Sequence, residues 1–528
     1  MHRIDRRRLL ILGAGLAGTA VPSALRANGD RADRPRLDAE ERAALDRFRA
    51  RPGAMPLWHG SAAAERRAEA LLAAIGAAER HGLEPEDYGF EELLRLRADP
   101  ARFEPAASAA FLAYARDLAR GRPLPGLPPR PAEPAEAPAA LLDRMGLAPD
   151  PTALLVGLAP ATPRYGRLLP LLAELRAVAA RGGWTPVPAP ERKVEPGERH
   201  PAVPALRRRL AETDGFAGPL DGEELDPPLV AALLRFQERH GLEPDGVFGR
   251  RTAAALARPV AWRIAQVILA LERLRRLPPE RRPRWLLVDI AGFRLELIEE
   301  PEPGRETVLL ESPIIVGTRY DQTPELTVRG VALTLNPYWN VPRSIAVEEI
   351  LPEVRKDPTW LARNETVVLD RDGRRVDPAT VDWRALGPGN FPYRFRQDWG
   401  PKNPLGRIKL EMPNRFDVYL HDTPKKELFA RAERTFSHGC MRVARMHELA
   451  ALLLAEQGWD LARLEATIAA GGPRTIPLRT RPLVHVTYLG AAVDPDGTVR
   501  FRADVYGRDT RLAAALGLSP ETLLSLRD

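Results

Sequence analysis

The sequence predicts an α+β multidomain protein in which a helical N-terminal part is followed by a mostly β C-terminal part. The chain has 528 residues, 44% of them hydrophobic, which is enough for two or three cores of ordinary domain size. Helical periodicity dominates up to about residue 257, whereas short apolar runs and period-two alternation begin near residue 284. These two patterns predict separate helical and β domains.

The first 29 residues have the pattern of an export signal. Three arginines at positions 6–8 precede an apolar run over residues 11–21, and small residues lead to Ala24 and Ala27. The run is shorter than the roughly 20 residues that a membrane-spanning helix needs. We therefore expect export to the periplasm by a twin-arginine-like or ordinary secretory signal, and no membrane span in the mature chain.

Residues 36–185 are predicted to form a helical domain. Within residues 62–81, Ala68, Leu72 and Ile75 share one helical face, and Gly82 marks the end of that helix. Further helical faces are expected at residues 111–118 and from Tyr165 onward. The Pro-rich stretch over residues 123–138 is predicted to be an extended linker.

Residues 198–257 are predicted to form a second, smaller helical unit. Two amphipathic segments, residues 203–210 and 229–237, are typical of helices, and residues 241–249 carry turn-forming Gly, Pro and Asp.

A mostly β domain is expected over residues 284–465, with strands at 285–290 and 294–298, short apolar runs at 308–310 and 314–316, and alternation at 331–335. Residues 351–397 interrupt this domain with charged and aromatic residues and are too long for an ordinary loop, so a lid is expected there. Residues 466–528 are predicted to form a C-terminal hairpin and tail, because Asp494-Pro495-Asp496-Gly497 is a strong turn signal between two strand-like segments, 484–489 and 498–505.

Charge and cysteine content exclude several classes of protein. The net charge of +7 is dispersed among acidic residues and accompanies no recognition motif, which argues against a nucleic-acid-binding protein. The single cysteine excludes a disulfide within the chain and a zinc site built from cysteines. We expect neither a metal site nor a cofactor.

That single cysteine, Cys440, has the neighbours that an activated thiol needs. His438 and Gly439 directly precede it, and His421 lies upstream at the end of a strand-like segment that includes Tyr419. Gly439 permits close approach of a substrate, so its amide and that of Cys440 are candidate donors to an oxyanion. The residues after Cys440 are expected to enter a helix whose dipole would favour a thiolate. A lone cysteine can instead be a small buried hydrophobic residue, but such a residue needs no flanking Gly, His and Arg.

His421, a spacer and the segment Ser437-His438-Gly439-Cys440-Met441-Arg442 resemble the signature of the L,D-transpeptidases that cross-link bacterial peptidoglycan. The resemblance extends to residues 336–346, 391–397 and 403–407. Asp422 follows the histidine where short members of the family commonly have Gly, and in this respect the chain resembles the long periplasmic branch. Residues 82–88 and the helix with Tyr114 resemble the scaffold domain of that branch. Residues 198–257 resemble a three-helix peptidoglycan-binding domain, although such a module can also merely brace the enzyme.

The resemblance implies a set of roles and partners. Cys440 would be the acylated nucleophile and His421 its general base, oriented by the backbone carbonyl of Asp422. The remaining candidates are Ser437, His438, Gly439, Asp422 and Arg442, which would form the oxyanion site or support the catalytic pair, and the cleft residues Tyr338, Trp339, Asn340 and Tyr419. The partners would be donor and acceptor stem peptides of peptidoglycan, with carbapenem β-lactams as inhibitors. The substrate-capping segment of the family falls on residues 351–397.

Two alternatives remain. A cysteine peptidase, an L,D-carboxypeptidase, would use the same Cys440 and His421 but transfer the acyl group to water. A noncatalytic peptidoglycan-binding protein would depend on residues 198–257 alone.

Overall fold

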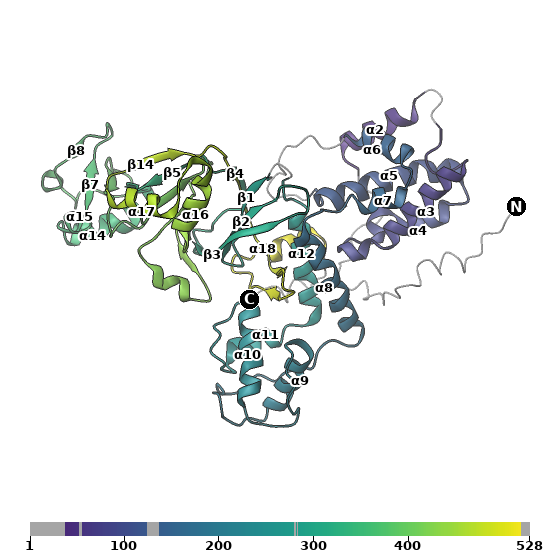
Figure 1. Ribbon diagram of the computed structural model, residues 1–528, viewed down its shortest axis with the longest axis horizontal. Helices are drawn as coiled ribbons and strands as arrows, with labels where there is room; N and C mark the ends of the chain where they lie inside the picture. Colours follow the sequence, from purple (N-terminus) through teal and green to yellow (C-terminus); the bar gives the residue numbers. More distant parts are fainter. Residues whose placement is uncertain (1–36, 52–54, 124–136, 279–280, 282, 519–528) are drawn as a thin grey trace. The chain divides into compact units, whose positions relative to one another are not determined.

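The computed structural model in Figure 1 describes residues 37–51, 55–123, 137–278, 281 and 283–518. The predicted export signal, residues 1–29, and most of the predicted Pro-rich linker lie outside the described residues. The chain divides into two compact units. One comprises the chain up to Pro279 with Glu302–Glu306 and the segment from Tyr488 onward, and the other comprises Glu280–Pro301 and Thr307–Thr487. The predicted α+β multidomain class is confirmed.

The first unit begins with a helical bundle built around one long helix, α5. Its elements are α2 (Ala39–Arg49), α3 (Ala62–Gly76), η2 (Ala78–His81), η3 (Pro85–Tyr88), α4 (Phe90–Leu96), α5 (Pro100–Arg120), α6 (Pro138–Leu147) and α7 (Pro151–Val156). The Ser61 hydroxyl caps α3, and the single helix predicted over residues 62–81 is divided into α3 and the 3-10 helix η2, which ends at Gly82 with φ +68°. Phe103, Phe111 and Leu118 of α5 are buried in the core of the bundle.

The small helical unit predicted over residues 198–257 contains α9 (Val203–Thr213), α10 (Pro227–Arg239) and α11 (Arg250–Leu256). Phe236 lies in its core. The neighbouring Gln237 is buried, and its side-chain amide donates to Asp245 Oδ1 (2.8 Å) and accepts from the Gly246 amide (2.9 Å). These residues therefore hold the loop between α10 and α11 in place, which is a role in folding.

Helix α12 (Val260–Leu274) forms the centre of another core in this unit. It packs with α8 (Pro163–Ala180), α18 (Arg508–Ala515) and the hairpin of β16 (Ala491–Val493) and β17 (Val499–Phe501). The predicted turn at Asp494 is present, but the hairpin strands are shorter than predicted, and residues 483–487 pair in the other unit. Within the described residues no single helix is long and apolar enough to span a membrane. Helices α11 and α12 reach the required length and apolar composition only when they are taken together, and they are bent by 80° relative to one another.

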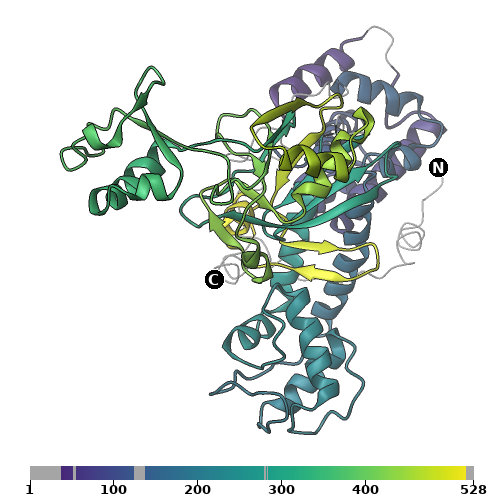
Figure 2. The same ribbon diagram turned by 60° about the vertical axis from the view of Figure 1, so that its left-hand side comes forward.

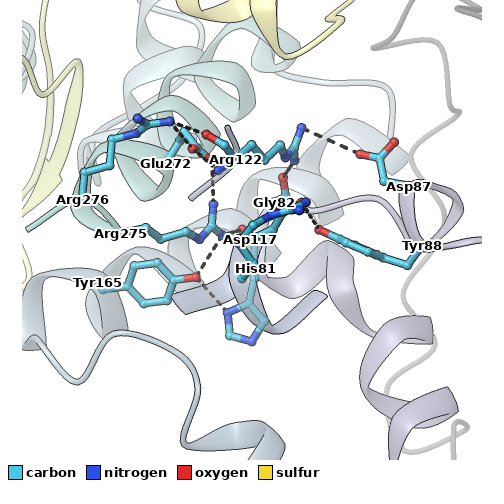
Figure 3. Close-up of polar contacts among 11 residues, drawn as sticks. His81, Gly82, Asp87, Tyr88, Asp117, Arg122, Tyr165, Glu272, Arg275 and Arg276 are labelled. Carbon is cyan, nitrogen blue, oxygen red and sulfur yellow. Dashed lines mark hydrogen bonds and ion pairs between the residues drawn. The ribbon is translucent and has the colours of Figure 1, made fainter. Parts of the chain in front are cut away.

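A buried network of charged groups surrounds the C-terminal end of α12 (Figure 3). Arg275 and Arg276 pair with the Glu272 carboxylate at 3.2 and 3.1 Å, and the same carboxylate accepts from the Arg122 amide at 2.8 Å. Tyr165 accepts from Arg275 (3.0 Å) and contacts His81 (3.1 Å). Burial, followed by the charge of Arg275, lowers the pKa of His81 to about 4. Because buried charges are costly unless paired, this network ties α12 to residues 81 and 122.

The second unit contains an eleven-stranded sheet with the order β14-β5-β10-β11-β13-β3-β2-β1-β15-β4, and β12 pairs with β3 beside this path. Its strands are β1 (Arg284–Asp289), β2 (Arg294–Glu299), β3 (Thr307–Gly317), β4 (Leu326–Arg329), β5 (Ala332–Leu335), β10 (Ile408–Glu411), β11 (Leu420–His421), β12 (Thr435–Ser437), β13 (Met441–Val443), β14 (Arg474–Pro477) and β15 (Leu483–Thr487). The helical segments of the sheet domain are η7 (Lys426–Ala430), α16 (Met446–Leu454), η8 (Ala455–Gln457) and α17 (Leu461–Ala469).

The apolar runs at 308–310 and 314–316 both lie in one strand, β3, which pairs with β2 and β13 along its length. One prediction about this sheet was wrong. Strands β14 and β15 were assigned to a separate C-terminal segment, whereas β14 pairs with β5 and β15 pairs in parallel with β1. The sheet therefore extends beyond residue 465, and long-range pairing of this kind leaves no local sequence signal.

The insertion between β5 and β10 forms a subdomain, called here the cap (Trp339 to Gln397), which projects from the sheet in Figure 2. It contains β6 (Trp339–Asn340), α13 (Arg343–Ile345), the π-helix η5 (Ala346–Ile350), α14 (Leu351–Lys356), α15 (Trp360–Arg363), β7 (Thr366–Leu369), β8 (Arg375–Val376), η6 (Pro378–Thr380) and β9 (Arg394–Gln397). The predicted start at residue 351 was wrong, because Trp339 pairs with Gln397 and Ile345 lies in the cap's own core.

Candidate active site

Three adjacent strands bring the predicted catalytic residues together. His421 in β11 pairs with Lys409 of β10 on one side and with Arg442 of β13 on the other. Cys440 directly precedes β13, where the Met441 amide donates to the Tyr419 carbonyl at 3.0 Å. Paired residues and residues two apart share a face of a sheet, so Cys440, Arg442, Tyr419, His421 and Lys409 lie on one face.

His421 is held in a defined protonation state. Its Nδ1 lies 2.5 Å from the Asp422 carbonyl oxygen, and because a carbonyl can only accept, the proton is on Nδ1 and Nε2 carries a lone pair. Burial, and then the charge of Arg442, lower the pKa of His421 to about 3, against the opposing effect of the Asp422 carbonyl. The imidazole is therefore neutral at neutral pH and able to accept a proton from a neighbouring group.

Cys440 is half-buried, and its Sγ lies 3.9 Å from the Asp417 carbonyl oxygen. Burial raises the pKa of the thiol, although hydrogen bonds with Tyr419 and the charges of Lys409 and Arg442 oppose this. The helix expected to begin at the cysteine does not exist there, because Met441–Val443 is strand β13 and α16 begins only at Met446. The expected helix-dipole stabilisation of a thiolate was therefore wrong, and thiol and imidazole rest as a neutral pair.

The turn before the cysteine is held by Ser437 and Gly439. The Ser437 hydroxyl donates to the Cys440 carbonyl (2.5 Å) and accepts from the Gly439 amide (3.2 Å). Gly439 has φ +101°, a conformation that side-chain-bearing residues rarely adopt, and its carbonyl accepts from Thr323 Oγ1 at 2.8 Å. The Gly439 amide is thus engaged by Ser437, whereas the Cys440 amide has no hydrogen-bond partner among the described residues. Of the two expected oxyanion donors, only the Cys440 amide is free.

His438 interacts with the cap and not with the residues on this face of the sheet. Its Nε2 is 2.6 Å from Glu349 Oε1 in η5 of the cap, and both side chains are about half exposed. His438 therefore connects the turn before Cys440 with the cap.

The candidate cleft residues fall into two groups. The Tyr419 ring lies 5.6 Å from the His421 ring, and burial followed by the proximity of Cys440 raises its pKa far above the ordinary value. Trp339 and Asn340 instead pair with β9 of the cap, and Tyr338 stacks under Arg396 at 4.4 Å. No described contact joins these three residues to Cys440 or His421.

Several residues with roles at the site were missed from the sequence. Lys409 lies in register with His421 and 4.1 Å from the Tyr419 ring, and Thr323 holds the Gly439 carbonyl. The alternation of residues 408–411 could have predicted a strand with Lys409 facing one side, but not which strand it pairs with. Thr323 lies far from Cys440 in sequence and gives no signal.

A thiol and a neutral imidazole on one face of a β domain, with an unengaged amide at the thiol-bearing residue, define a candidate cysteine acyl-transfer site. Comparisons with protein-family models place this site in a known domain. Residues 283–475 match the L,D-transpeptidase catalytic domain, residues 43–172 match the scaffold domain, and residues 199–256 match a domain described as "Putative peptidoglycan binding domain". The chain thus contains an L,D-transpeptidase catalytic domain together with a scaffold domain and a peptidoglycan-binding domain.

A "Putative L,D-transpeptidase" of Haemophilus influenzae is 34% identical to the chain over 244 residues, which cover 46% of this chain and 48% of the relative. The chain thus spans about half the length of this curated relative. Among solved structures, an L,D-transpeptidase from Xylanimonas cellulosilytica (residues 123–326) has 16% identity and a TM-score of 0.19, and covers 57% of this chain and 100% of its own. A fused Zn-dependent amidase/peptidase with a peptidoglycan-binding domain from Clostridium acetobutylicum has 10% identity and a TM-score of 0.16, with coverages of 56% and 99%.

The protonation states lead to a prediction for thiol reactivity. Because the pKa of Cys440 is raised, the thiolate fraction should grow throughout the range from pH 6 to 8, and the rate of alkylation by iodoacetamide should rise about tenfold per pH unit. His421→Ala should lower the rate at pH 7 by about tenfold, because the neutral base is lost. His438→Ala is the matched control and should change it less, since His438 binds Glu349. A rate that stays constant down to pH 5 would indicate a thiolate–imidazolium pair and contradict this prediction.

Proposed function

We propose that this protein is an exported peptidoglycan L,D-transpeptidase that forms cell-wall cross-links through a thioester on Cys440. The observation that carries the proposal is the placement of Cys440 beside the β11 strand of His421, whose imidazole is held neutral with its proton on Nδ1. The match of residues 283–475 to the L,D-transpeptidase catalytic domain supports the same reaction class.

In the proposed acylation step, Cys440 Sγ attacks the carbonyl carbon of a peptide bond in the donor stem while His421 Nε2 accepts the thiol proton. The Cys440 amide donates to the oxyanion that forms. When this intermediate collapses, the C–N bond breaks and the imidazolium gives its proton to the departing amine. The products are a thioester on Cys440 and a free amino acid.

In the second step, an amine of the acceptor stem attacks the thioester and His421 again accepts a proton. Collapse breaks the C–S bond and returns the proton to sulfur, so the enzyme is regenerated and a new amide bond joins two stems. Hydrolysis would follow the same course with water in place of the amine, and would make the protein an L,D-carboxypeptidase.

The test is to incubate the purified protein with disaccharide tetrapeptide stems and analyse the products by mass spectrometry. Transpeptidation predicts a cross-linked dimer that has lost one terminal residue, together with the free amino acid. Shortened monomers without dimers would indicate the carboxypeptidase, and unchanged stems that bind the protein would indicate a noncatalytic wall-binding protein. A carbapenem provides an independent readout, because acylation should add its mass only to the peptide that contains Cys440.

Export to the periplasm is part of this proposal. It rests on the arginines at positions 6–8 and the apolar residues 11–21, and it agrees with a peptidoglycan substrate. The match of residues 199–256 to a peptidoglycan-binding domain suggests that this unit holds the enzyme on the wall.

A further inference from the structure

We propose that the Asp422 carboxylate is a positioning group: it anchors the backbone carbonyl that keeps the proton of His421 on Nδ1. The consequence for catalysis rests on the proposed function of His421, whereas the anchoring itself rests only on the contacts described below.

The carbonyl in question needs an anchor because of its place in the fold. Strand β11 consists only of Leu420–His421, so Asp422 lies just beyond the strand and its carbonyl is bound to the His421 ring instead of a neighbouring strand. The Asp422 amide donates to the Ile408 carbonyl at 2.8 Å, which fixes the backbone on the N-terminal side of the residue. This single backbone contact leaves the Cα atom of Asp422, and with it the peptide that carries the carbonyl, less firmly placed than it is when the side chain is also held.

The side chain is held by three neighbours. Asp422 Oδ2 accepts from the Arg407 amide (2.9 Å) and lies 3.8 Å from His447 Nε2, and Oδ1 accepts from Lys426 Nζ (2.5 Å). Burial alone would raise the pKa of Asp422, but the interactions with His447 and Lys426 lower it well below the usual range. The carboxylate is therefore charged at neutral pH, buried and bound on both oxygens, an arrangement that strongly restricts its position.

Gly406 leaves space for this carboxylate because it has no side chain. Gly406 has φ +62°, and a Cβ at this position would lie 2.3 Å from Asp422 Oδ2 and 2.6 Å from the Thr423 amide nitrogen. The preceding Asn403 forms the turn, since its Oδ1 accepts from the Leu405 amide at 2.8 Å and its carbonyl accepts from the Gly406 amide at 3.0 Å. Residues 403–407 thus build one wall of the Asp422 site, without touching Cys440.

His447 extends the support to two helices. Its Nε2 lies 3.8 Å from Asp422 Oδ2, and its Nδ1 lies 3.8 Å from Glu465 Oε1. His447 belongs to α16 and Glu465 to α17, so residues from both helices help to place the imidazole beside the carboxylate. From the sequence, Asp422 was expected to orient His421 through its backbone carbonyl, and no contact of its side chain with His447 was predicted.

The anchor matters because an imidazole has two neutral tautomers. If the carbonyl moves, the ring can rotate or carry its proton on Nε2, and in that form it cannot accept the thiol proton from Cys440. The loss should fall on kcat, because Asp422 is buried and its side chain is not exposed to a substrate.

The experiment compares Asp422→Ala, Asp422→Asn and Lys426→Met in the full chain. We expect kcat for cross-linking to fall about 100-fold in Asp422→Ala and about three- to tenfold in Asp422→Asn, which can still accept from the Arg407 amide, with KM within about twofold. Lys426→Met removes one partner from a half-exposed position and should resemble Asp422→Asn. Asp494→Ala removes another buried carboxylate, paired with Arg500 in the hairpin, and is the matched control for general destabilisation.

A spectroscopic measurement separates positioning from stability. With ¹⁵N-labelled histidine, the Nδ1–H of His421 should give a slowly exchanging proton signal in the wild type that is lost in Asp422→Ala. His240, whose Nδ1 lies 2.7 Å from the buried Phe236 carbonyl, provides an internal reference that should persist in every variant that remains folded.

Each outcome decides the proposal. Loss of the His421 signal with retention of the His240 signal supports the anchor even if the wild type forms no cross-links, in which case only the proposed function fails. A retained His421 signal in Asp422→Ala, or a kcat within about threefold of the wild type, overturns the anchor. If Asp422→Ala does not fold, Lys426→Met and Asp422→Asn decide, and wild-type signals and rates in both would overturn it.

Discussion

Replacement of Cys440 by alanine should abolish cross-linking, with a fall in rate of at least about 10³-fold, because the atom that forms the thioester is removed. The fold should persist, since the side chain is half-buried and the change removes a single sulfur atom. Cross-linking is measured with tetrapeptide stems, and the folded state by thermal unfolding and by binding to isolated peptidoglycan. Because Cys440 is the only cysteine, thiol titration should fall from one per chain to zero.

The control for this variant is Ser437→Ala, which removes a hydroxyl from the same turn but leaves the sulfur in place. It should reduce the rate by a smaller factor, because Ser437 only holds the Gly439 amide and the Cys440 carbonyl. Residual cross-linking of Cys440→Ala close to the wild-type rate would rule out the thioester mechanism.

Removal of the cap should leave a folded sheet domain that no longer cross-links efficiently. Residues 339–397 would be replaced by a short Gly-Ser linker, because Trp339 and Gln397 are paired and the Asn403 side chain donates to the Pro337 carbonyl (3.0 Å), so the two ends lie close together. The cap has its own hydrophobic core, which includes Phe395, and its removal should not open that of the sheet. Deletion of residues 351–397 alone would instead expose the part of this core that contains Ile345.

We expect the cap-deleted protein to be alkylated at Cys440 as readily as the wild type, but to cross-link stems about 100-fold more slowly, because positioning of the substrate supplies much of the rate. Glu349→Gln is the matched control. It breaks only the exposed ion pair with His438, which is worth little energetically, and should change the rate by less than about threefold. If the deleted protein cross-links stems as fast as the full chain, the cap is not a functional lid.

The fold class and the candidate nucleophile could be predicted because both leave local signals. The change from helical to alternating periodicity depends only on near neighbours in sequence, and so do the end of a helix at Gly82 and the turn at Asp494. The same is true of Ser437-His438-Gly439-Cys440, in which a tight turn needs its glycine next to the reactive residue.

The errors have a common physical cause. The residues after Cys440 have a reasonable helical pattern, yet they form β13 because β11 and β3 offer hydrogen-bonding partners on both sides. The cap was predicted too short because the pairing of Trp339 with Gln397 connects residues far apart in sequence.

The sequence by itself determined the α+β organisation and the identity of Cys440 and His421 as the candidate pair. Only the tertiary structure decided their protonation states, because the pKa values of Cys440 and His421 depend on burial and on Arg442, which reaches them through strand pairing. It also decided that the Gly439 amide is engaged by Ser437, and that the Asp422 carboxylate lies among Arg407, Lys426 and His447. Local sequence patterns report backbone preferences, whereas electrostatics and hydrogen bonding depend on which distant residues the fold brings together.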